Sequence, residues 1–130
     1  MRVPMAKVAK HVAKNPVARA VARERLKNAI RDQKIAIYLL TPGEACAELL
    51  AGVSGTMTVV LNAGQFDGLS GPDMSILKGG LNACLQVMLA DSYDTTQTTA
   101  IVAGLDKATF LAGKVRPESI NQAWARMQHE

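Results

Sequence analysis

The sequence predicts an all-α protein, a compact bundle of five or six helices with a basic amino-terminal helical arm. Apolar residues recur at helical spacing along most of the 130 residues. Capping residues, prolines and glycines interrupt that pattern at intervals that suit helices of ordinary length. Only residues 56–61 are rich in β-branched residues. The composition, 48% hydrophobic and 20% charged, is typical of a folded domain rather than of a disordered chain.

Two parts of the chain are expected, a basic arm at residues 1–15 and a single helical domain at residues 16–130. The arm contains a short predicted helix over residues 5–14, and its apolar face is thin. Another face of this helix is basic and consists of Lys7, Lys10 and Lys14.

Two long helices are predicted after the arm. Asn15 and Pro16 resemble an N-cap followed by proline at the first helical position. The next chain break is the Thr-Pro-Gly run at residues 41–43, so the first long helix covers residues 16 to about 40. Thr41 and Glu44 have the spacing of a capping box, which predicts that the second long helix begins at Pro42.

Residues 56–61 leave two interpretations open. Their sequence, Thr-Met-Thr-Val-Val-Leu, suits a β-strand. A helix is favoured, because apolar residues continue at helical spacing from Cys46 to Leu61, across Gly52 and Gly55. The glycines of residues 64–71 then predict a loop.

Three further helices are predicted. They begin at Pro72, at a capping box over residues 94–97, and at Pro117, and the second of them ends near Gly113. Their apolar spacing indicates which side chains face the core. These residues are Leu77, Leu81, Cys84, Leu85, Met88, Ile101, Leu105, Ala108, Ile120 and Trp124.

Small residues recur every four positions on two of these helices. One row consists of Ser75, Gly79 and Ala83, and the other consists of Ala100, Gly104, Ala108 and Ala112. Such rows let two backbones approach closely, so the two helices are expected to pack as an antiparallel pair. The alternative is that Gly79 and Gly80 form a kink or open a ligand cleft.

The cysteines and the hydropathy bear on location. Cys46 and Cys84 lie in apolar surroundings without a CxxC pair, and no secretory signal is recognised, so buried reduced thiols are favoured over a disulfide. This favours a cytoplasmic location. The longest uninterrupted apolar run, residues 35–40, is much shorter than the roughly 20 residues that cross a bilayer. No transmembrane segment is therefore expected.

No catalytic residue, metal site or cofactor site is predicted. The two histidines, His11 and His129, have no spaced cysteine, histidine or carboxylate partners that would hold zinc. The chain contains no GxSxG, GxxxxGK[ST] or GxGxxG motif. Carboxylate pairs such as Glu44 with Glu48 fit exposed helix faces better than acid–base catalysis. A binding protein is therefore favoured over an enzyme.

Charge is distributed unevenly along the chain. Residues 1–34 contain ten Lys or Arg and two acidic residues, a net charge of +8. The other 96 residues contain five Lys or Arg and nine acidic residues, a net charge of −4. Within the first long helix, cations recur every three or four positions and form one basic stripe. The predicted binding residues are Lys7, Lys10, Lys14, Arg19, Arg23, Lys27, Arg31 and Lys34.

A polyanion is the expected partner of these residues. Duplex nucleic acid is favoured, because phosphate contacts need only cations, whereas proteins that bind single strands add aromatic platforms that the basic segment lacks. An acidic protein surface is the main alternative, which would suit a small inhibitor or adaptor, including an accessory protein of a phage or mobile element. An oligomer whose arms pack on neighbouring copies, a membrane surface and a merely solvated helix face also remain open.

Overall fold

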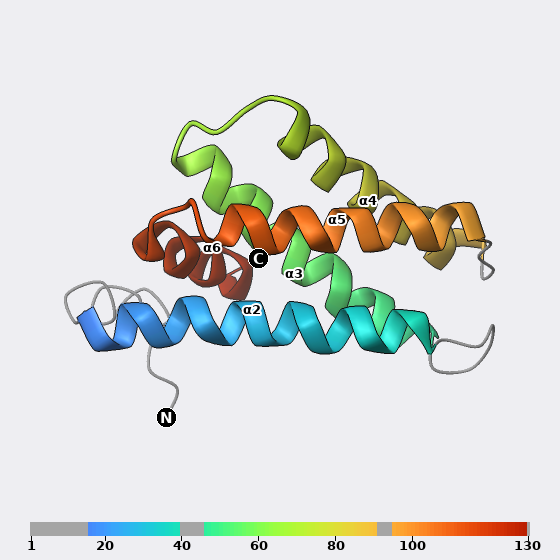
Figure 1. Cartoon of the computed structure of the whole chain (residues 1–130), viewed down its shortest axis with the longest axis horizontal. Helices are drawn as coiled ribbons and strands as arrows, with labels where there is room; N and C mark the ends of the chain where they lie inside the picture. Colours follow the sequence, from blue (N-terminus) through green and yellow to red (C-terminus); the bar gives the residue numbers. More distant parts are fainter. Residues whose placement is uncertain (1–15, 40–45, 91–94, 130) are drawn as a thin grey trace.

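The computed structural model (Figure 1) describes residues 16–39, 46–90 and 95–129, with the backbone alone at residues 16–20, 22, 46, 90, 95, 128 and 129. These residues form five helices and no strand, which confirms the all-α prediction for this part of the chain. The predicted arm over residues 1–15 and the predicted helix start at Pro42 lie outside the described residues. The helices are α2 (Pro16–Tyr38), α3 (Cys46–Phe66), α4 (Pro72–Ala90), α5 (Thr95–Ala112) and α6 (Pro117–His129).

Residues 56–61 lie within α3, so the helical interpretation is confirmed and the strand is wrong. The helix also continues into the predicted loop and ends at Phe66. Gly68, with φ of 73°, follows, and Leu69 N–H donates to Gly64 O at 2.8 Å. This arrangement is a Schellman motif, in which a glycine in the left-handed region satisfies the last carbonyls of a helix. The loop is therefore shorter than its glycines predict.

Among the described helices, α3 contacts each of the other four. α5 packs most extensively against α4 and also contacts α2, while α6 packs against α3 and α2 (Figure 1). From their amino to their carboxyl ends, α2 and α5 run in opposite directions (Figure 1). Every helix contributes a fully buried side chain to one core, among them Ile30, Met57, Leu77, Leu105 and Ile120.

The closest helix contact is between α4 and α5, at Gly80 and Gly104. A Cβ placed on Gly80 would lie 2.8 Å from Gly104 Cα and 3.0 Å from Ala100 O, well inside van der Waals contact. A Cβ on Gly104 would lie 2.9 Å from Gly80 Cα. The two helices run in opposite directions (Figure 1), so the predicted close antiparallel pair is confirmed.

The predicted row of small residues on α4 is correct only at Ala83, which is buried. Ser75 and Gly79 are exposed, and nothing lies within 4 Å of a Cβ placed on Gly79. The buried face instead follows Leu77, Gly80 and Cys84, which are three and four residues apart. Large apolar side chains decide which face of a helix is buried, so the glycine beside that stripe makes the contact.

The expected apolar stripe of α4 is also too wide. Leu85 and Met88 are 45% and 38% exposed, which contradicts the prediction that they face the core, and Val87 is buried instead. A helix at the side of a bundle buries one stripe only, so apolar residues beyond that stripe remain in solvent. The other side chains predicted to face the core are buried, except Leu81 and Trp124, which are partly buried against it.

Asp67, which directly follows α3, caps the amino terminus of α6. Its carboxylate accepts hydrogen bonds from Arg116 N–H at 2.7 Å, from Arg116 Nε at 2.9 Å and from Ser119 Oγ. Arg116 precedes the first helical residue and has no capping side chain of its own, so a different element supplies the acceptor. Burial alone would raise the pKa of Asp67, but these hydrogen bonds and the Arg116 charge hold the pKa below its ordinary value.

Among the described residues, the length and apolar composition of α3 bear on the prediction that the chain has no transmembrane segment. Its segment Ala47–Phe66 is long and apolar enough to cross a membrane, judged by length and composition alone. In the bundle 44% of that window is buried, and the helix contacts all four other helices, as a core helix would. The absence of a transmembrane segment stays a prediction. Cys84 is a buried thiol, as expected, and the side chain of Cys46 is not described.

Candidate nucleic-acid interface

The predicted basic stripe lies in different environments along α2. Lys7, Lys10 and Lys14 lie outside the described residues, as does the side chain of Arg19. Arg23, Lys27 and Lys34 are half-buried at the edge of the face that packs on the bundle, whereas Arg31 is exposed. That face itself consists of Leu26, Ile30 and Ile37.

Two cations of the stripe hold α2 against the bundle. Arg23 Nη2 donates to Val115 O at 2.8 Å, in the turn before α6. Lys34 Nζ forms a hydrogen-bonded ion pair with Asp106 of α5. The hydrogen bond to Asp106 raises the pKa of Lys34 above its ordinary value, so the lysine is charged at neutral pH. Arg23 and Lys34 therefore already have partners within the molecule.

Gln33 adds a link between α2 and α3. Its Nε2 donates to Thr56 Oγ1 at 2.9 Å, and Thr56 Oγ1 donates to Gly52 O at 3.1 Å. Because Thr56 is buried, this hydrogen bond satisfies a polar group that would otherwise lie in an apolar core. Polar links from Arg23, Gln33 and Lys34 thus accompany the apolar contacts and fix which side of α2 faces solvent.

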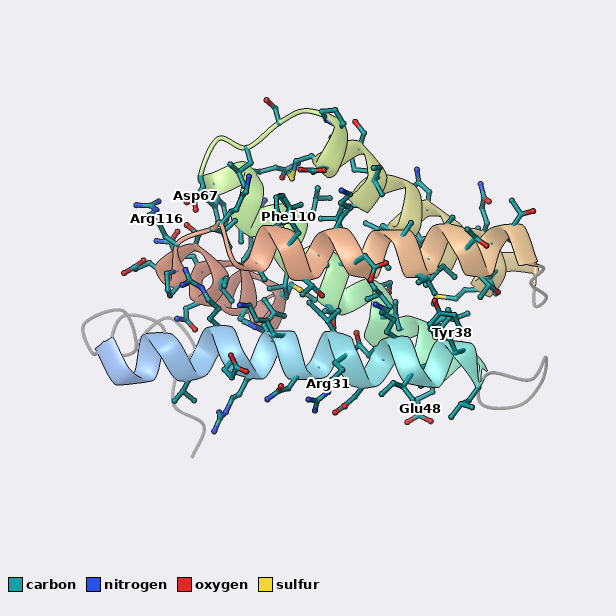
Figure 2. The ribbon with its side chains drawn as sticks, viewed as in Figure 1. Arg31, Tyr38, Glu48, Asp67, Phe110 and Arg116 are labelled. Carbon is teal, nitrogen blue, oxygen red and sulfur yellow. The ribbon has the colours of Figure 1, made fainter. Side chains whose placement is uncertain are left out.

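Arg25 and Arg31 are the described cations of α2 that are exposed to solvent. Arg31 projects from the side of α2 turned away from α5 (Figure 2), where its Nε lies 3.5 Å from the carboxylate of Asp32. Exposed pairs of this kind contribute about 0–1 kcal/mol, so a phosphate could replace the carboxylate at little cost. Glu24 is exposed as well, so the outward face of the described helix carries both signs of charge.

Sequence reasoning missed Arg25, which does not fall on the row drawn through the other cations. The row was defined by the spacing of charges, whereas packing is decided by Leu26, Ile30 and Ile37. That apolar row is the signal that could have located the buried face and, with it, the exposed arginines. The structure therefore divides the predicted stripe into inward-facing cations and outward-facing ones.

The surplus of positive charge comes from the beginning of the chain. Residues 1–20 contain five Lys or Arg and no acidic residue, whereas on α2 the exposed Arg25 and Arg31 are balanced by Glu24 and Asp32.

The described residues include no group of three or more histidine, cysteine, aspartate or glutamate side chains that could hold a metal ion. The chain matches no protein-family model, and the searches of curated proteins and of solved structures return no similar protein.

Proposed function

We propose that this protein binds nucleic acid through phosphate contacts made by its basic amino-terminal segment, and that it acts in the cytoplasm by binding rather than by catalysis. Five cations without a single acid in residues 1–20 carry the proposal. Each phosphate contact displaces condensed counterions, which favours binding at low salt and needs no base recognition. Duplex nucleic acid is the favoured partner, because contacts of this kind require only a regular row of phosphates.

The first test measures binding to a blunt DNA duplex and to an RNA duplex across a range of salt concentrations. Three double variants each remove two positive charges: Lys10→Gln with Lys14→Gln in the arm, Arg25→Gln with Arg31→Gln on α2, and Lys78→Gln with Arg126→Gln elsewhere. Each lost phosphate contact lowers the slope of log K against log salt by about 0.9. We expect the arm variant to lose about two contacts and the control on α4 and α6 to keep the wild-type slope.

The α2 variant separates two versions of the proposal. An intermediate loss of slope would place Arg25 and Arg31 in the interface, and an unchanged slope would confine the interface to the arm. Equal losses in all three variants would contradict a defined interface, because net charge alone would then explain the binding. Absence of salt-dependent binding to either duplex would overturn the proposal.

A second candidate function is association with protein, including with further copies of this chain. Two helices end in exposed apolar side chains, with Leu39 77% and Leu89 89% exposed, and Tyr38 is exposed beside Leu39. The ends of α2 and α4 lie toward the same end of the molecule in Figure 1. Large apolar side chains exposed to this extent could be covered by a partner protein.

Light scattering at high salt tests this second candidate, because high salt suppresses phosphate-type contacts but strengthens apolar ones. A mass above that of one chain, reduced by Leu39→Ser with Leu89→Ser, would support association through these helix ends. A single-chain mass in high salt would contradict self-association, and Ile76→Ser, at an exposed apolar residue elsewhere on α4, serves as the control.

A further inference from the structure

Phe110 of α5 forms an exposed aromatic site with two lysines, Lys107 of the same helix and Lys114 of the turn that follows it. Phe110 is 46% exposed. Lys114 Nζ lies 4.4 Å from the centre of the ring, and Lys107 Nζ lies 5.7 Å from it. Lys107 and Phe110 are three positions apart, so they are neighbours on the helix surface. Figure 2 shows Phe110 on the side of α5 away from α2.

The charges around the ring are mainly positive. Lys114 is exposed, and Lys107 pairs with Asp73 of α4 at 3.0 Å. Asp73 neutralises one of the two lysines, and Asp106, four residues before Phe110 on α5, is paired with Lys34 of α2. Lys114 stands over the ring in a cation–π contact of the kind that exposed sites hold weakly, at roughly 0.5–1 kcal/mol. A ligand with both a flat ring and an anionic group would satisfy Phe110 and Lys114 together.

Two further cations lie near the end of α5. A Cβ placed on Gly113 would lie 4.0 Å from Lys27 Nζ, so this lysine of α2 reaches the end of α5. Arg116, in the turn after α5, is bonded to Asp67, and the two lie together in Figure 2.

We propose that Phe110 is a stacking platform for single-stranded nucleic acid, with Lys114 contacting a phosphate of the same strand. This inference rests on the proposed function, in that both have nucleic acid as the ligand, but it names a different site and a different form of the ligand. A duplex hides the faces of its bases within its own stack, whereas an unpaired base can place its face on an exposed ring. Base stacking was not expected because the basic segment lacks aromatic residues. Phe110 lies far from that segment in the chain.

The test compares binding of a twelve-nucleotide poly(dT) strand and of a blunt duplex to the full chain. Phe110→Leu keeps an apolar side chain but removes the aromatic face, and we expect it to weaken binding of the single strand about tenfold. Leu85→Ala trims an apolar side chain of α4 that is 45% exposed, as Phe110 is 46% exposed, and serves as the control, expected to have no effect. Circular dichroism melting shows whether each variant is folded, and the exposure of Phe110 predicts that it is.

Two further variants distinguish stacking from a general effect on the surface. Phe110→Trp retains an aromatic face, so we expect it to bind like the wild type and to lose indole fluorescence when poly(dT) is added, beyond any change seen for Trp124 in the wild type. Lys114→Gln is expected to lower the salt slope for the single strand by about 0.7, the contribution of one phosphate contact.

The outcomes separate this inference from the proposed function. A tenfold loss for the single strand with unchanged duplex binding in Phe110→Leu supports the platform. Equal binding of poly(dT) by the wild type and Phe110→Leu overturns it, and the phosphate-binding function then stands or falls on the duplex measurements alone. A single strand that binds through Phe110 when no duplex binds would support the platform and overturn the proposal of duplex binding by the arm.

Discussion

Asp67 joins the end of α3 to the start of α6 through three hydrogen bonds, and its carboxylate is the acceptor in each of them. Because the pKa of Asp67 is lower in the folded protein than in the unfolded chain, the unfolded state binds more protons near that pKa. The stabilisation is therefore fully present above the ordinary aspartate pKa of about 3.9, and it is lost as the pH falls through the folded pKa.

Replacing Asp67 by asparagine tests this linkage. Hydrogen bonds to a charged group contribute roughly 1.5–3 kcal/mol, so Asp67→Asn is expected to lower the free energy of unfolding by about that amount at pH 7. The difference from wild type should narrow below about pH 4, as the wild-type carboxylate becomes protonated. Urea unfolding at pH 7 and pH 3 measures this difference in the free energy of unfolding. Asp73→Asn, at an exposed ion pair, is the control, expected to cost about 0–1 kcal/mol.

Neighbouring glycines in α4 are expected to respond to alanine with opposite signs. Gly79→Ala enters open space and replaces a poor helix former, so it should stabilise the protein by up to about 1 kcal/mol. Gly80→Ala would meet the backbone of α5, which can move only with its whole helix, so it should destabilise the protein by about 1–3 kcal/mol. Thermal unfolding of the two variants measures the difference. Stabilisation by Gly80→Ala would contradict the close crossing at Gly104.

At the scale of one element, α2 combines cations that hold the fold with cations that face solvent. Arg23 donates to a backbone carbonyl of the turn before α6, whereas Arg31 pairs with its exposed neighbour Asp32. Arginine and methionine have similar helix propensities. Replacing each arginine by methionine therefore compares the surroundings of Arg23 and Arg31, because the effect on the helix itself is the same at both positions.

We expect Arg23→Met to lower the free energy of unfolding by about 1 kcal/mol or more, because Val115 O loses a charged donor. Arg31→Met should change stability by less than about 0.5 kcal/mol, as is usual for an exposed side chain. Urea unfolding measures both variants. Equal losses would show that the contact to Val115 does not hold α2 in place, and a larger loss for Arg31→Met would reverse the assignment of the two faces.

At the scale of the whole molecule, one core joins all five described helices, because α3 contacts each of the others. Detaching any one helix from the bundle would therefore expose buried apolar surface on its neighbours. The prediction of a single domain over residues 16–130 implies that these helices unfold together.

Two probes that follow different parts of the molecule test this cooperativity. Trp124 packs against the core from α6, so its fluorescence reports on that helix, whereas far-ultraviolet circular dichroism reports on all the helices. The two urea transitions are expected to coincide. Separate midpoints would show that α6 unfolds independently, and the expectation of one domain over residues 16–130 would then be wrong.

The helical class and most of the described helix boundaries follow from local features of the sequence. Proline at the start of α2, α4 and α6 limits where each can begin, and glycine beyond α3 allows the left-handed residue that ends it. These features act within a few residues, so the sequence displays them directly. The uneven charge is likewise a property of the chain, and it remains the basis of the proposed binding function.

Which face of each helix is buried depends on how the helices pack together. This packing placed Gly80 rather than Gly79 at the contact with α5, left Leu85 and Met88 in solvent, and turned Arg23 and Lys34 toward the bundle. A helical pattern fixes the spacing of side chains around one axis, but the width and direction of the buried stripe depend on the neighbours that cover it. Asp67 could not be recognised as a cap for the same reason, because its acceptor role exists only where α3 and α6 meet.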